Sequence, residues 1–90
     1  MNFKVEHSQE KRKPSESYRY IISYEGKEFA VLSHDFRGEV TGIKVIKSGY
    51  WELPPFASCA DFLTGGGPEP LGLSSMAIKY LEKLLKEKET

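Results

Sequence analysis

The sequence predicts an α+β fold in which helices cover one face of a small antiparallel β-sheet. Three observations lead to this expectation. Alternating, β-rich segments fill the first half of the 90-residue chain, a glycine-containing turn signal joins two of them, and the chain ends in the apolar spacing of an amphipathic helix. Strands followed by helices favour a hairpin meander of about four to five strands, with a short helix and a longer C-terminal helix packed on one side.

The composition is typical of one folded domain that spans residues 1–90. Hydrophobic residues make up 39% of the chain and aromatic residues 12%, which is enough apolar material for a core. The 13 basic and 13 acidic side chains cancel, so no overall charge attracts the chain to nucleic acid or to an anionic membrane. Cys59 is the single cysteine, which excludes an internal disulfide. Without a signal-like or membrane-spanning apolar run, we expect a cytoplasmic protein.

The strongest strand signal is a hairpin over residues 18–33, YRYIISYEGKEFAVLS. Glu25 and Gly26 suit a two-residue turn, because glycine accepts the positive φ that such a turn requires. Side chains alternate across each strand, so counting outward from this turn assigns every residue to one of two faces. This register places on the buried face Tyr18, Tyr20, Ile22, Phe29 and Val31. It places on the opposite face Arg19, Ile21, Ala30 and Leu32.

Two further regions have strand character. Residues 3–7 alternate apolar and polar side chains, with the period of a half-buried strand. Residues 43–53 have strand composition, and Ser48-Gly49 offers a second two-residue turn. Such a turn would pair Ile46 with Trp51, but it would divide neighbouring apolar residues between the two faces. A bulge in this region, or a strand that is apolar on both faces, is therefore the alternative.

Helices are expected after the double proline at 54–55. The first is short, with Phe56, Ala60 and Leu63 forming one apolar stripe and Gly65 just past its end. The second begins after Ser74, whose hydroxyl suits an N-cap. Its buried stripe is expected to contain Ala77, Ile78, Leu81, Leu84 and Leu85.

Two segments read as connections. Residues 8–16 contain no large apolar side chain, which predicts a mobile polar loop. Residues 64–72 contain glycines and prolines that predict a joint between the two helices. Glycines before a helix can also cradle a phosphate, but the lysine of a phosphate loop is missing here. We therefore interpret Gly65 to Gly67 as part of the joint, with a generic anion site at the helix start as the alternative. No cofactor is predicted.

Few residues of this chain suit catalysis or metal binding. The chain has two histidines, His7 and His34, and a zinc site would require both to converge with a carboxylate. We predict no metal site, and we expect His34 and Asp35 to lie in a turn with His34 exposed. Cys59 and His34 are candidates for a nucleophile and its base. Because Cys59 is expected in a helix as a small buried side chain, an enzyme centred on this pair is only our third hypothesis.

A local basic patch suggests nucleic-acid binding as the second hypothesis. Lys11, Arg12 and Lys13 neutralise phosphates in such a role, and nearby tyrosines stack on bases. Because those tyrosines are expected in the core, and because Glu10 and Glu16 dilute the charge, this hypothesis ranks below protein binding. Its candidate residues are Lys11, Arg12, Lys13, Arg19 and Lys27.

The leading hypothesis is a small non-enzymatic module that binds another protein or forms a homodimer. Tryptophan and tyrosine often anchor protein interfaces, and Tyr50 and Trp51 stand before a proline pair that ends the sheet. The face of the sheet away from the helices is expected to add Ile21 and Leu32 to this surface. The predicted partner-binding residues are therefore Tyr50, Trp51, Ile21 and Leu32.

Overall fold

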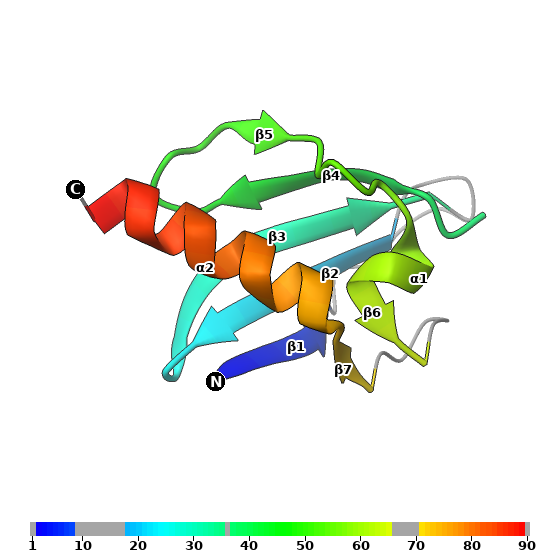
Figure 1. Ribbon diagram of the computed structural model, residues 1–90, viewed down its shortest axis with the longest axis horizontal. Coiled ribbons are helices and arrows are strands. Elements are labelled where there is room, and N and C mark those ends of the chain that lie inside the picture. Colours follow the sequence, from blue (N-terminus) through cyan, green and yellow to red (C-terminus); the bar gives the residue numbers. More distant parts are fainter. Residues whose placement is uncertain (1, 9–17, 36, 66–70, 90) are drawn as a thin grey trace.

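The computed structural model describes residues 2–8, 18–35, 37–65 and 71–89. Within these residues, five antiparallel strands form a sheet in the order β1-β2-β3-β4-β5, and β6 pairs with β7 in a separate small sheet. Both helices lie on the same face of the larger sheet (Figure 1), which confirms the predicted α+β architecture. The elements are β1 (Phe3–His7), β2 (Tyr18–Tyr24), β3 (Lys27–His34), β4 (Val40–Val45), β5 (Trp51–Glu52), α1 (Cys59–Phe62), β6 (Leu63–Thr64), β7 (Gly72–Leu73) and α2 (Ser75–Glu89).

The turn between β2 and β3 is the predicted two-residue turn. Glu25 and Gly26 have φ angles of 50° and 81°, and Tyr24 pairs with Lys27 on either side of them. Two consecutive positive φ angles match the twist of the flanking strands and are typical of a type I′ turn. The hairpin predicted from the sequence is therefore confirmed.

The register beyond this turn differs from the prediction. Ser23 pairs with Glu28 as expected, but Ile22 pairs with Ala30 rather than with Phe29. Phe29 is the extra residue of a β-bulge, and a bulge exchanges the faces of all residues that follow it. Leu32 therefore lies opposite Tyr20 in the core and is fully buried. The prediction that Leu32 and Ala30 lie on the uncovered face was wrong.

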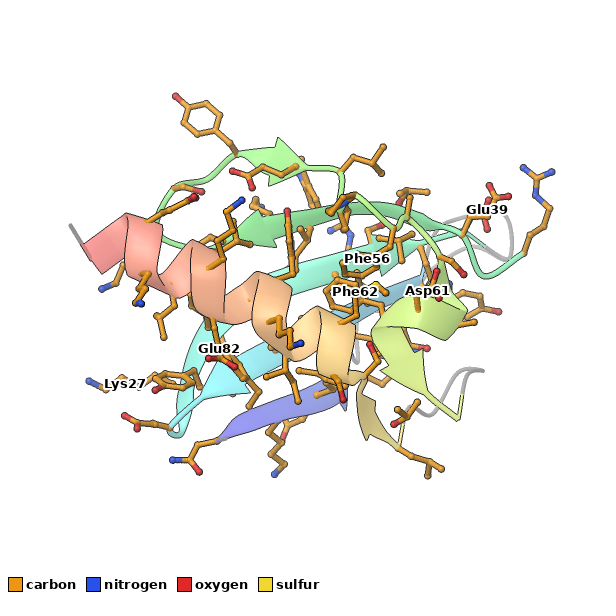
Figure 2. All side chains as sticks on the ribbon, in the orientation of Figure 1. Lys27, Glu39, Phe56, Asp61, Phe62 and Glu82 are labelled. Carbon is orange, nitrogen blue, oxygen red and sulfur yellow. The ribbon has the colours of Figure 1, made fainter. Side chains whose placement is uncertain are left out.

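The core lies between the sheet and α2. Tyr20 and Ile22 are fully buried, as predicted, whereas Tyr18 is partly exposed at the end of β2. Phe56 packs edge-to-face on Tyr80 with 5.8 Å between ring centroids, and it lies beside Phe62 near the N-terminal end of α2 (Figure 2). The buried apolar residues are Tyr20, Ile22, Ala30, Leu32, Val40, Ile43, Val45, Cys59, Phe62, Leu63, Ala77, Leu81 and Leu84.

The connection between β4 and β5 is longer than a two-residue turn. Lys44 pairs with Trp51 and Ile43 pairs with Glu52, so residues 46–50 form the connection. The backbone N–H groups of Ser48 and Gly49 both donate to the Val45 carbonyl at 3.1 Å. The predicted pairing of Ile46 with Trp51 was therefore wrong, and Ile46 leaves the sheet to become exposed.

The first helix is shorter than the sequence pattern suggested. α1 contains four residues, and Leu63 and Thr64 continue as β6 rather than as helix. Cys59, Phe62 and Leu63 are buried, whereas Ala60 is exposed. The predicted stripe of Phe56, Ala60 and Leu63 was wrong, because the pairing of Leu63 with Leu73 ends the helix early.

The second helix agrees with the sequence prediction. The Ser74 hydroxyl accepts a hydrogen bond from the Ala77 N–H at 3.1 Å, which is the expected N-cap contact. Ser74 also donates to the Asp61 carbonyl, so the cap joins α2 to α1. Ala77, Leu81 and Leu84 face the core.

The two predicted connections are described only in part. Of the predicted polar loop at 8–16, residues 9–16 lie outside the described residues. In the predicted joint at 64–72, Thr64 pairs with Gly72, while residues 66–70, including Gly66 and Gly67 of the alternative anion site, lie outside them. No helix among the described residues has the length and apolar composition needed to cross a membrane.

Candidate binding surface

The face of the sheet opposite the helices carries Trp51. The observed register aligns Ile21, Val31, Lys44 and Trp51 in one row across β2 to β5. Trp51 retains 46% of its surface exposed. A large aromatic side chain therefore remains half accessible on a face that the two helices leave uncovered (Figure 1).

Gly42 holds the Trp51 ring close to the sheet. A Cβ atom at position 42 would lie 3.1 Å from Cε3 of Trp51, which is closer than most real contacts of this kind. Because glycine has no Cβ, the indole ring can lie against the backbone of β4. The ring is therefore supported on one side by the sheet.

Two cations lie beside the same ring. Lys44 Nζ is 5.0 Å from the Trp51 ring centroid, and Arg19 Cζ is 5.9 Å from it. Both distances are within the range of cation–π attraction. We call this surface the Trp51 face, which consists of Arg19, Ile21, Val31, Ser33, Gly42, Lys44 and Trp51.

Exposed apolar side chains continue around the outer edge of the sheet. Tyr50 is 75% exposed and Leu53 is 64% exposed, and they flank β5 on either side. Ile46 is also exposed in the connection that precedes them. Within the described residues, β5 pairs on one side only. We call Ile46, Tyr50 and Leu53 the β5 edge.

The structure brings together three of the four predicted partner-binding residues. Trp51 and Ile21 share the Trp51 face, and Tyr50 adjoins it at the β5 edge. Leu32 lies in the core, because the Phe29 bulge turns it inward. The predicted exposure of Leu32 is thus corrected.

The predicted nucleic-acid residues do not form one patch. Arg19 contributes to the Trp51 face, whereas Lys27 lies at the β2–β3 turn, at the opposite end of the hairpin (Figure 2). Lys11, Arg12 and Lys13 lie outside the described residues. Lys44 was missed by the sequence analysis, because its position beside Trp51 follows from the five-residue connection between β4 and β5.

His34 is buried rather than exposed. Its ring stacks on Tyr20 with 5.2 Å between centroids and an interplanar angle of 11°. Nδ1 lies 2.7 Å from the Asp35 carbonyl oxygen, so Nδ1 carries the proton that is donated there. Nε2 is buried without a hydrogen-bond partner. The predicted turn itself is confirmed, since the Asp35 carboxylate accepts hydrogen bonds from the Arg37 and Glu39 N–H groups.

The geometry around Cys59 does not favour nucleophilic chemistry. Cys59 is buried, and burial raises the pKa of its thiol, which disfavours the reactive thiolate. No hydrogen bond links Cys59 to the unpartnered Nε2 of His34. Burial, followed by the nearby Cys59 and Tyr18, raises the pKa of Tyr20 to about 12. These residues act as core residues in this structure.

One surface pocket lies away from the Trp51 face. It has a volume of ≈ 250 Å³ and lies between the β2–β3 turn and the end of α2. Its apolar lining includes Phe29, Val45 and Leu85, and its charged residues are of both signs. This mixture favours no particular ion. Among the described residues, histidine, cysteine, aspartate and glutamate form no group of three suited to a metal ion.

Comparison with known proteins assigns no relative. No family model, no curated protein and no solved structure matches this chain.

Proposed function

We propose that this chain is a small non-enzymatic binding module that contacts another protein, or a second copy of itself, through the β5 edge and the adjoining Trp51. The observation that supports this most is the distribution of exposed apolar side chains. Of the seven large exposed hydrophobic residues in the described chain, four lie between positions 46 and 53. Such clusters are typical of protein interaction sites, whereas single exposed residues are ordinary.

The chemistry of this edge suits protein recognition. Tyr50 and Trp51 supply large, rigid contact areas that commonly dominate interface energy. The unpaired side of β5 also offers backbone groups to a partner strand. We place this activity in the cytoplasm, because a single free cysteine suits a reducing compartment.

The proposal is tested by removing the apolar side chains of the edge. The variant Tyr50→Ser with Leu53→Ser should lose self-association in light scattering, or lose the proteins captured by the wild type from its own cell extract. The expected weakening is roughly 30-fold or more if one of the two residues is an anchor.

A matched control removes exposed apolar side chains elsewhere. Leu71 and Met76 are exposed on another part of the molecule, so Leu71→Ser with Met76→Ser should leave association unchanged. A protein that is monomeric at all concentrations, and whose captured proteins are the same for wild type and edge variant, contradicts the proposal.

A further inference from the structure

We propose that the Trp51 face binds single-stranded nucleic acid, an activity in addition to the protein contact proposed for the β5 edge and Trp51. In this arrangement, a base stacks on the Trp51 ring while Arg19 and Lys44 contact neighbouring phosphates. The proposal differs from the patch predicted by sequence, because it depends on Lys44 and excludes Lys27.

The ring of Trp51 provides the surface on which a base would stack. Trp51 is half exposed and its ring lies against Gly42, so the ring is held near the sheet before any ligand arrives. Every base has a flat aromatic surface, and a base gains this contact only when it is unpaired and accessible. A stacked base of this kind strengthens binding by roughly 5- to 100-fold.

Arg19 and Lys44 lie close enough to the Trp51 ring to contact the phosphates of a stacked nucleotide. Arg19 Cζ and Lys44 Nζ lie 5.9 and 5.0 Å from the ring centroid, so the two groups are at most 10.9 Å apart, the sum of these distances. Both therefore lie within reach of the phosphates that flank one stacked base. Phosphates compete for these flexible side chains, which leaves the ring free for the base.

The charged groups nearest to the Trp51 ring favour an anionic ligand. Although the chain has no net charge, Arg19 and Lys44, whose charged groups lie within 6 Å of the Trp51 ring centroid, are both cations. Glu6 lies on the same face, next to Ile21 on β1, and is paired with Lys4 at 3.1 Å, while Glu28 lies on this face of β3 opposite Ser23, towards the β2–β3 turn. The surroundings of the ring therefore complement a polyanion. A supported aromatic ring with two cations close to it favours nucleic acid over an acidic peptide, because a carboxylate does not stack.

The experiment uses Trp51 as its own reporter. Trp51 is the only tryptophan in the chain, so intrinsic tryptophan fluorescence reports on this site alone. Adding a single-stranded oligothymidylate of about 20 nucleotides should quench this fluorescence at low salt, and affinity should fall as salt rises. A duplex of the same length should quench it less, because its bases are already stacked.

The variants separate the two contributions. Arg19→Gln with Lys44→Gln should reduce the slope of log affinity against log salt by about 1.4, which corresponds to about 0.7 for each lost phosphate contact on a single strand. Trp51→Leu, followed with a fluorescein-labelled oligonucleotide, should weaken binding by roughly 5- to 100-fold. Lys79→Gln with Lys83→Gln on the exposed side of α2 should change neither quantity.

Three results would overturn the proposal. The first is that no oligonucleotide binds at low salt. The second is that the Arg19, Lys44 and Trp51 variants bind as the wild type does. The third is that polyglutamate displaces the oligonucleotide at equal charge concentration. The edge variant Tyr50→Ser with Leu53→Ser should retain oligonucleotide binding. If the edge variant loses protein contact while the wild type binds no oligonucleotide, only the nucleic-acid proposal fails. If the wild type binds the oligonucleotide but the edge variant keeps its protein contact, only the proposed function fails.

Discussion

The position of Leu32 provides a direct test of the β-bulge at Phe29. With the bulge, Leu32 is fully buried opposite Tyr20 and Ile43, and Val31 lies on the uncovered face. Without it, their positions would be exchanged. Leu32→Ala removes a side chain whose neighbours are themselves fully buried, so the site has little freedom to collapse and we expect a cost of about 3–5 kcal/mol. Val31→Ala removes partly exposed atoms and should cost about 1 kcal/mol or less.

The assay is urea unfolding followed by circular dichroism, supported by thermal melting. A difference of about 2 kcal/mol between the two variants corresponds to roughly 8–16 °C in Tm for a domain of this size. If Leu32→Ala leaves too little folded protein to measure, Leu32→Val gives a smaller loss in the same direction. The bulge at Phe29 is contradicted if Val31→Ala destabilises the protein as much as, or more than, Leu32→Ala.

Three further predictions concern the helix cap, the support of Trp51 and the alkaline limit of stability. Ser74→Ala should lower the free energy of unfolding by about 0.5–2 kcal/mol, since it removes the hydroxyl that accepts a hydrogen bond from the Ala77 N–H. Ser75→Ala is the control in urea unfolding, and an equal loss of stability in both variants would argue against the cap. Gly42→Ala should shift the tryptophan emission of the folded protein, because the new Cβ would lie 3.1 Å from Trp51 Cε3; an unchanged spectrum would show that the ring does not lie on Gly42. Tyr20 has a folded-state pKa raised from 10.0 to about 12, so its contribution to stability is present below pH 10 and is lost as pH rises towards 12. Tyr18→Phe, which removes the phenol of a partly exposed tyrosine, should retain this alkaline loss, whereas Tyr20→Phe should reduce it. Equal unfolding curves for the two variants above pH 10 would contradict the assignment.

Much of the fold follows from local signals in the sequence. Glu25-Gly26 specifies a turn whose backbone few other residue pairs adopt, and Ser74 marks the start of α2 through its hydroxyl. The bulge was not predictable in the same way. Residues 29–32 are Phe, Ala, Val and Leu, so both faces of β3 are apolar and alternation cannot distinguish one register from the next.

Long-range pairing explains the other errors. The apolar spacing of Phe56, Ala60 and Leu63 fits a helix, but Leu63 pairs with Leu73, which is distant in sequence. Local periodicity contains no information about that partner. The candidate site was likewise predictable only in part. Trp51 was identified from its residue type and the prolines that follow, whereas the roles of Gly42 and Lys44 depend on the length of the β4–β5 connection.

Both proposed activities require Trp51 to be accessible on the uncovered face of the sheet, and nucleic-acid binding also requires the two cations near its ring. Collisional quenching of its fluorescence tests this directly, by comparing iodide with caesium at equal ionic strength. We expect iodide to quench Trp51 efficiently and more than caesium does, and we expect Arg19→Gln with Lys44→Gln to reduce this difference. Tryptophan emission that resists both ions in the folded protein would contradict this expectation.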